Sequence, residues 1–141
     1  MAIKTIFNPL LVEGFQKLSD VSNAAHVQTV QTTDGLLTPV TGSKAIAVGS
    51  VQSFITRVTA IEGATDDVFV HEYKGAIKRT SGGVTSLVDT VINETIAEDA
   101  GAATWSVTFT AGAGELDLGI TGEAAHTIEW RIETVFSEII Y

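Results

Sequence analysis

The chain has 141 residues, a length typical of a single domain, and its 45% hydrophobic and 18% charged residues indicate a folded core. Its 17 acidic and 8 basic residues give a formal net charge of −9, which repels a phosphate backbone and excludes nucleic acid as an expected partner. Cysteine is absent, so disulfides and thiolate metal sites are excluded.

The first ten residues, MAIKTIFNPL, are unusually apolar for a chain terminus. Asn8, Pro9 and Glu13 interrupt the apolar run that a signal peptide needs, and no A-x-A cleavage site follows. No stretch approaches the ~18 apolar residues of a membrane helix, so no membrane partner is expected. Two interpretations stay open, an edge strand of the fold or an arm for a partner. We prefer the second and predict an extended N-terminal arm at residues 1–20.

Residues 21–43 are rich in Ser, Thr, Asn and Gly, a composition typical of connecting segments. Within them, HVQTVQT has the character of a strand, whereas TDG and TPVTGS indicate turns. This region is therefore predicted to be a linker that contains one strand or edge segment.

Residues 44–141 show apolar and polar side chains in alternation over short segments, with glycine-rich turns such as SGG and AGAG between them. DTVINETIAED has near-helical spacing, but its β-branched residues favour a strand. The pattern predicts an all-β fold, an antiparallel β-sandwich or jelly-roll-like domain. The residues expected to face its core include Trp105, Val107, Phe109, Ala111, Leu116, Leu118, Ile120, Ile128, Trp130 and Ile132.

Residues able to carry out chemistry are scattered. His26, His71 and His126 lack the spacing of a metal site and are expected on the surface or at strand ends. The acidic pairs at 66–67 and 98–99 lie outside any calcium-loop pattern, and no G-x-S-x-G or phosphate-loop motif occurs. We therefore predict no catalytic, cofactor-binding or metal-binding residue, and a protein that is not an enzyme.

Exposed aromatic side chains can stack on sugars, and four residues are candidates for that role. Trp105 and Trp130 lie on the apolar faces of their strands, so both are expected in the core. Tyr73 also lies within a strand pattern, whereas Tyr141 ends the chain and is not expected in the core.

The C-terminal sequence FSEIIY is as apolar as the N-terminal one. Two apolar ends on a compact domain indicate contacts with other chains. The predicted partner-binding residues are Ile3, Lys4, Ile6, Phe7, Asn8, Pro9, Leu10, Ile139, Ile140 and Tyr141.

IKTIFNP, at residues 3–9, resembles the opening of small structural proteins of tailed bacteriophages, in which K-T-I-F-N-P precedes an extended arm. EYKGAIKRTSGG, TWSVTF, ELDLGITG and HTIEWRIETVF resemble a β-sandwich domain of phage fibre and head-surface proteins. The resemblance covers about four-fifths of the chain, from residues 3–9 and 45–138, and implies a structural protein of the virion.

Two roles follow from that resemblance. We prefer a capsid decoration or cement protein, because no fibre shaft repeat is present. Such a protein would bind the major capsid (coat) protein, self-associate as a homotrimer and lie on the capsid surface of a virion assembled in the host cytoplasm, without a cofactor. The alternative is a tail-fibre or head-fibre domain that binds a receptor or glycan. A bacterial β-sandwich module with a small-molecule ligand is a third interpretation.

Overall fold

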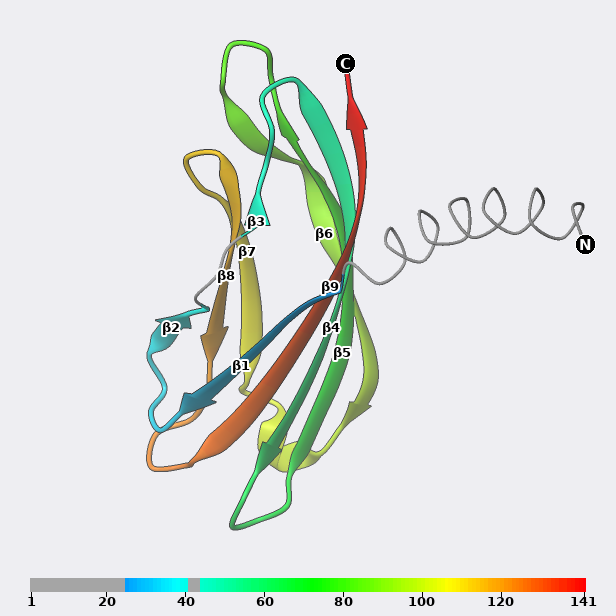
Figure 1. The fold of residues 1–141 in the computed structure, drawn as a ribbon. Coiled ribbons are helices and arrows are strands. Elements are labelled where there is room, and N and C mark those ends of the chain that lie inside the picture. Colours follow the sequence, from blue (N-terminus) through cyan, green and yellow to red (C-terminus); the bar gives the residue numbers. More distant parts are fainter. Residues whose placement is uncertain (1–24, 41–43) are drawn as a thin grey trace, which may run out of the picture.

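The computed structural model describes residues 25–40 and 44–141. Two antiparallel sheets form the two layers of a sandwich (Figure 1), which confirms the predicted all-β fold class. The predicted arm at residues 1–20 lies outside the described ranges. Within those ranges, no helix has the length and apolar character needed to cross a membrane.

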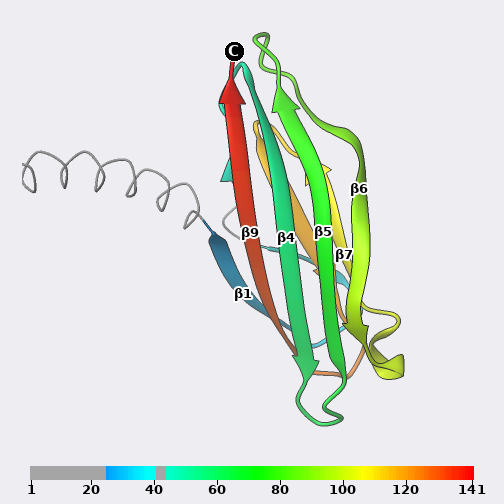
Figure 2. The ribbon, with the colours of Figure 1, turned by 90° about the vertical axis from the view of Figure 1, so that its right-hand side faces the viewer.

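The larger sheet has the strand order β1-β9-β4-β5-β6 and is seen face-on in Figure 2. β4 and β9 pair along their whole length, from Ser50 opposite Ile140 to Glu62 opposite Ile128. DTVINETIAED lies in β6 except for its last residue, Asp99, so the prediction of a strand there is confirmed. The strands of this sheet are β1 (His26–Thr32), β4 (Ser50–Glu62), β5 (Val68–Arg79), β6 (Thr85–Glu98) and β9 (Ile128–Ile140).

The smaller sheet is built around β8, which pairs with β7 on one side and with both β2 and β3 on the other. A short 3-10 turn, Ala100–Ala102, connects β6 to β7. The described part of segment 21–43 thus contributes β1 to the larger sheet and β2 to the smaller one. The strands are β2 (Leu37–Pro39), β3 (Lys44–Ala45), β7 (Ser106–Ala111) and β8 (Glu115–Thr121).

The core lies between the sheets and contains most of the side chains that the alternation assigned to it, whereas Val107, Phe109 and Ala111 are half-buried against it. Trp130 is 2% exposed, and its ring centroid lies 5.7 Å from that of Phe69 and 5.8 Å from that of Trp105. Its indole N–H donates a hydrogen bond of 2.9 Å to Thr32 Oγ1, which joins β9 to the edge strand β1. The prediction that both tryptophans belong to the core is confirmed. Leu116, Leu118, Ile120, Ile128 and Ile132 are buried with them.

Two of the predicted glycine turns have a backbone that favours glycine. Gly83 has φ +86° in the β5–β6 turn, and Gly114 has φ +90° in the β7–β8 turn. A side chain is strained in this left-handed region, whereas glycine adopts it readily. The SGG and AGAG motifs therefore form the turns that connect consecutive strands, as predicted.

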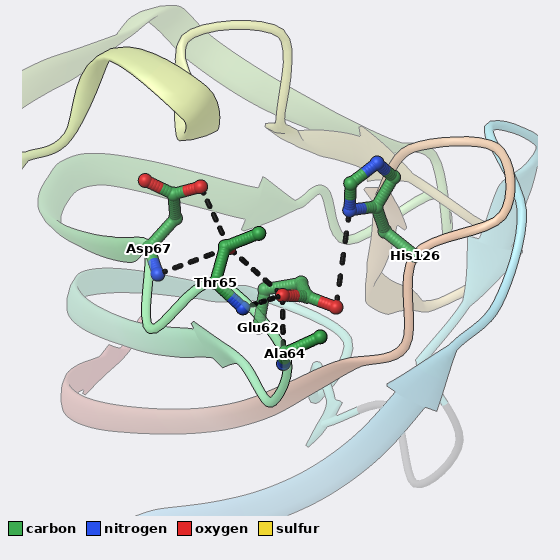
Figure 3. Close-up of polar contacts among 5 residues, drawn as sticks. All are labelled: Glu62, Ala64, Thr65, Asp67 and His126. Carbon is green, nitrogen blue, oxygen red and sulfur yellow. Dashed lines mark hydrogen bonds and ion pairs between the residues drawn. The ribbon is translucent and has the colours of Figure 1, made fainter.

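A buried carboxylate organises the β4–β5 turn (Figure 3). Glu62 accepts hydrogen bonds from the backbone N–H groups of Ala64 and Thr65, at 2.9 and 2.6 Å, and from the Thr65 hydroxyl at 2.8 Å. His126 Nδ1, from the β8–β9 connection, lies 3.8 Å from the other oxygen of Glu62. These contacts, led by the Thr65 hydroxyl, hold the pKa of the Glu62 carboxyl below its usual 4.5. The charged carboxylate therefore ties the turn to the connection beside it.

Candidate functional site

The inner face of β5 carries a row of three aromatic rings, Phe69, His71 and Tyr73. The His71 ring stacks on that of Phe69 with centroids 3.8 Å apart and planes 7° apart. His71 is only 4% exposed, so the expectation of a surface or strand-end histidine is wrong for this residue. The signal for its burial was present in the sequence, because His71 shares the alternating phase of Phe69 and Tyr73.

Two oxygen atoms of β6 face the nitrogens of the His71 ring. Nδ1 lies 2.9 Å from Asn93 Oδ1, and Nε2 lies 2.6 Å from Glu98 Oε2. Each ring nitrogen of His71 is therefore within hydrogen-bond distance of one of these oxygens. This network fixes the side chain of Asn93 at the open edge of the sandwich.

A bulge in β6 lies next to that network. Lys74 pairs with Ile92 and Ala76 pairs with Val88, so Gly75 alone faces the three residues 89–91. Asp89 has φ +66° in this bulge, a conformation that few residues other than glycine adopt. Non-glycine residues in such conformations cluster at functional sites, which makes the bulge a candidate.

A groove of about 360 Å³ lies between β6 and β7. We call it the β6–β7 groove. Aromatic and aliphatic side chains form one part of its lining, and Asp89, Thr90 and Asn93 supply a carboxylate, a hydroxyl and an amide. The apolar part comprises Tyr73, Leu87, Val91, Val107 and Phe109.

The β6–β7 groove combines the two chemistries that a small polar ring requires. A sugar presents apolar C–H faces, which suit the half-buried ring of Phe109, and hydroxyl edges that donate and accept hydrogen bonds. Tyr73 also borders the groove, but its ring is only 4% exposed and belongs to the core. Ligand sites are mainly apolar concavities with a few placed polar groups. The carboxylate, hydroxyl and amide of Asp89, Thr90 and Asn93 supply such groups on one side of the groove.

A second groove, of about 390 Å³, lies on the smaller sheet between β2 and the strands β7 and β8. Its described lining includes Leu37, Pro39, Thr110 and Asp117 but no aromatic ring. A sugar ring would find no stacking partner among these residues. The β6–β7 groove is therefore the stronger candidate.

Burial raises the pKa of Tyr73 to about 12 from its ordinary 10.0, and the negative charge of Glu98 adds to this effect. Tyr73 should therefore stay neutral in the folded protein well above pH 10. Because the folded protein favours the protonated phenol, Tyr73 adds to the free energy of unfolding. This contribution is complete below the pKa of tyrosine in the unfolded chain and is lost as the pH rises toward 12.

The titration of Tyr73 can be measured separately. Because the chain has only two tyrosines, Tyr141→Phe leaves Tyr73 as the single tyrosine. The near-ultraviolet absorbance of tyrosinate should then rise close to pH 12, and close to pH 10 in denaturant. Ionisation near pH 10 in the folded protein would contradict the burial of this ring.

The predicted C-terminal partner residues are exposed at one end of β9. Ile139, Ile140 and Tyr141 are 71%, 68% and 70% exposed. Ile139 pairs with Val51 and Ile140 with Ser50, so the two isoleucines point to opposite faces of the sheet. The structure therefore does not gather these three residues into one site. The predicted residues Ile3, Lys4, Ile6, Phe7, Asn8, Pro9 and Leu10 lie outside the described ranges.

No protein-family model and no curated protein matches the chain. Solved structures that it resembles include tailspike proteins of three phages: Acinetobacter baumannii bacteriophage Fri1, Acinetobacter phage vB_ApiP_P1 and Acinetobacter baumannii phage AM24. Sequence identities are 14%, 18% and 9%, and TM-scores are 0.37, 0.42 and 0.41, in the same order. The matches cover 82%, 80% and 82% of this chain but only 18%, 22% and 26% of the tailspikes.

One neighbour corrects an expectation drawn from the sequence. The Fri1 tailspike is described as a capsular polysaccharide depolymerase, which is an enzyme. The prediction that the chain is not an enzyme is contradicted by this finding and is withdrawn. The depolymerase activity is that of the Fri1 protein, of which this chain spans less than a fifth.

Proposed function

We propose that this chain is a domain of a phage virion surface protein of the tail-fibre or head-fibre type, and that its β6–β7 groove binds a glycan of the host surface. The sequence motifs that resemble phage fibre and head-surface proteins support the first part. The lining of the groove carries the second part, because it places the half-buried Phe109 ring and aliphatic side chains beside a carboxylate, a hydroxyl and an amide.

The bulge explains how the fold would present these groups. Three residues of β6 opposite one residue of β5 displace the chain from the regular ladder. The Asp89 carboxylate accepts the backbone N–H of Thr90 at 2.7 Å, which holds the bulge in a single shape. On the same strand, Asn93 is held by the His71 ring. A glycan would therefore meet polar groups that are already ordered, which lowers the entropy cost of binding.

The test is binding of the full chain to an array of bacterial capsular and O-antigen oligosaccharides, followed by calorimetry with the oligosaccharide that binds. The double variant Asp89→Asn, Thr90→Val should bind about 30-fold more weakly, because it loses two hydrogen bonds that are each worth about 1 kcal/mol. Asparagine tolerates the left-handed backbone of residue 89, so the bulge should keep its shape.

Thr110→Val is the matched control, because Thr110 is an exposed threonine that lines the second groove. It should leave the affinity unchanged. A loss of binding in Thr110→Val but not in the double variant would assign the glycan to the second groove. Failure of the wild-type chain to bind any oligosaccharide would remove the main support for a fibre-type role.

A capsid decoration role would place the coat-protein contact on the predicted N-terminal arm. That role, the coat protein as partner, the capsid surface as location and the homotrimer stay predictions. Counting copies on purified particles would separate the two roles, because a decoration protein is present in hundreds of copies and a tail component in far fewer.

A further inference from the structure

Within residues 25–40 and 44–141, no element covers the face of the larger sheet that points away from the smaller sheet (Figure 2). We call it the outer face. Ile55 lies at its centre on β4 and is 48% exposed, and its neighbour Val135 on β9 is 40% exposed. Val88 and Ile92 are further apolar side chains on β6, with 41% and 59% exposure, and Lys74 of β5 lies between Ile92 and Ile55. Exposed apolar side chains with polar ones around them are typical of protein interfaces.

The charges on the outer face balance one another. Lys74 lies 3.2 Å from Glu72 and 2.6 Å from Glu94, and Arg57 lies 2.9 Å from Glu72. Among the described residues of this sheet, four cationic and four anionic side chains point outward. They are Arg57, Lys74, Lys78, Arg131, Glu72, Glu94, Glu129 and Glu133.

This neutrality sets the outer face apart from the molecule as a whole. The chain carries a net charge of −9, yet half of its 8 basic residues lie on this one face. Two copies that approach through other surfaces repel each other, whereas two outer faces carry no net charge. Their alternating charges also allow cations of one copy to meet anions of the other. The surface is therefore suited to another copy of the same acidic chain.

The size of the outer face matches what a stable contact between two proteins requires. β4 has 13 residues, which at ~3.3 Å per residue gives a length of about 43 Å. Five strands spaced ~4.8 Å apart span about 19 Å, so the face covers roughly 800 Å². A standard interface buries about 800 Å² on each partner.

We propose that the outer face of the larger sheet packs against the outer face of a second copy of this chain. Ile55 and Val135 lie in the contact, and the neighbouring charges form its polar part. The proposal does not depend on the β6–β7 groove, which lies at the edge of the sandwich between β6 and β7.

Sedimentation of the full chain between about 1 and 100 μM tests the proposal. The wild type should associate, and Ile55→Glu and Val135→Glu should each raise the dissociation constant at least about 100-fold, because a carboxylate would be buried without a partner. Both positions are exposed in the single chain, so each variant should fold, as circular dichroism would verify.

Leu36→Glu is the control, because Leu36 is 71% exposed in the connection between β1 and β2, directly before the smaller sheet. It should associate as the wild type does. A wild type that stays monomeric over the whole range would overturn the proposal. So would association that Ile55→Glu and Val135→Glu weaken no more than Leu36→Glu does.

Discussion

Replacing Trp130 with alanine should lower the free energy of unfolding by about 3–5 kcal/mol. The indole is 2% exposed and packs against Phe69 and Trp105, so its removal leaves a large cavity between the sheets. It also removes the hydrogen bond to Thr32 that ties β1 to the core. Domains of this size have a total stability of about 5–15 kcal/mol, so the variant should be only marginally folded. Urea unfolding followed by circular dichroism measures the change.

Trp130→Phe separates packing from hydrogen bonding at this position. Phenylalanine keeps much of the buried area but leaves the Thr32 hydroxyl without its donor, which should cost about 1–3 kcal/mol. A Trp130→Ala loss below about 1 kcal/mol would show that the two sheets close over the missing ring.

Gly75→Ala should destabilise the domain by about 1–3 kcal/mol, although it adds a single methyl group. A Cβ at residue 75 would lie 2.6 Å from the tip of the Phe54 ring, which faces Gly75 across β4 and β5. Phe54 cannot move away easily, because its ring centroid lies 5.4 Å from that of Phe109 and 6.4 Å from that of Phe136. Thermal or urea unfolding measures the loss.

Gly82→Ala is the matched control for this prediction. A Cβ at residue 82 would meet only Thr80 Oγ1, at 3.8 Å, in an exposed turn. Its effect should be close to zero or slightly stabilising, because alanine restricts the unfolded chain. Replacing the Phe54 ring with the smaller side chain of leucine, in the Gly75→Ala variant, should recover part of the lost stability. Equal stability of Gly75→Ala and Gly82→Ala would show that Phe54 does not constrain residue 75.

Most of the core was predictable from the sequence because burial within a strand is a local property. Trp130 and its neighbours along β9 alternate with charged residues, so the phase of the strand follows from a few adjacent positions. The same rule applied to His71 would have placed it in the core beside Phe69. Histidine is a polar residue type, so the type alone does not indicate burial, whereas the position of His71 in the strand alternation does.

The β6–β7 groove was not predictable in this way. The groove depends on the position of the bulge, where the register between β5 and β6 shifts. That residues 89–91 all lie opposite Gly75 becomes known only when the pairing of the two strands is known. Asp89 then adopts a left-handed conformation that nothing in the surrounding sequence demands. The groove also needs Val107 and Phe109 from β7, which the sandwich brings beside the bulge.

By itself, the sequence determined the strands, their turns and the inward side of each strand, because alternation and glycine turns depend only on residues that are adjacent in the chain. Only the tertiary structure decided which outward side chains share a surface. Ile55 and Val135 are 80 positions apart in the chain, and strand pairing alone makes them neighbours. Because both candidate surfaces are formed by contacts between distant strands, the sequence contained their residues without showing that they belong together.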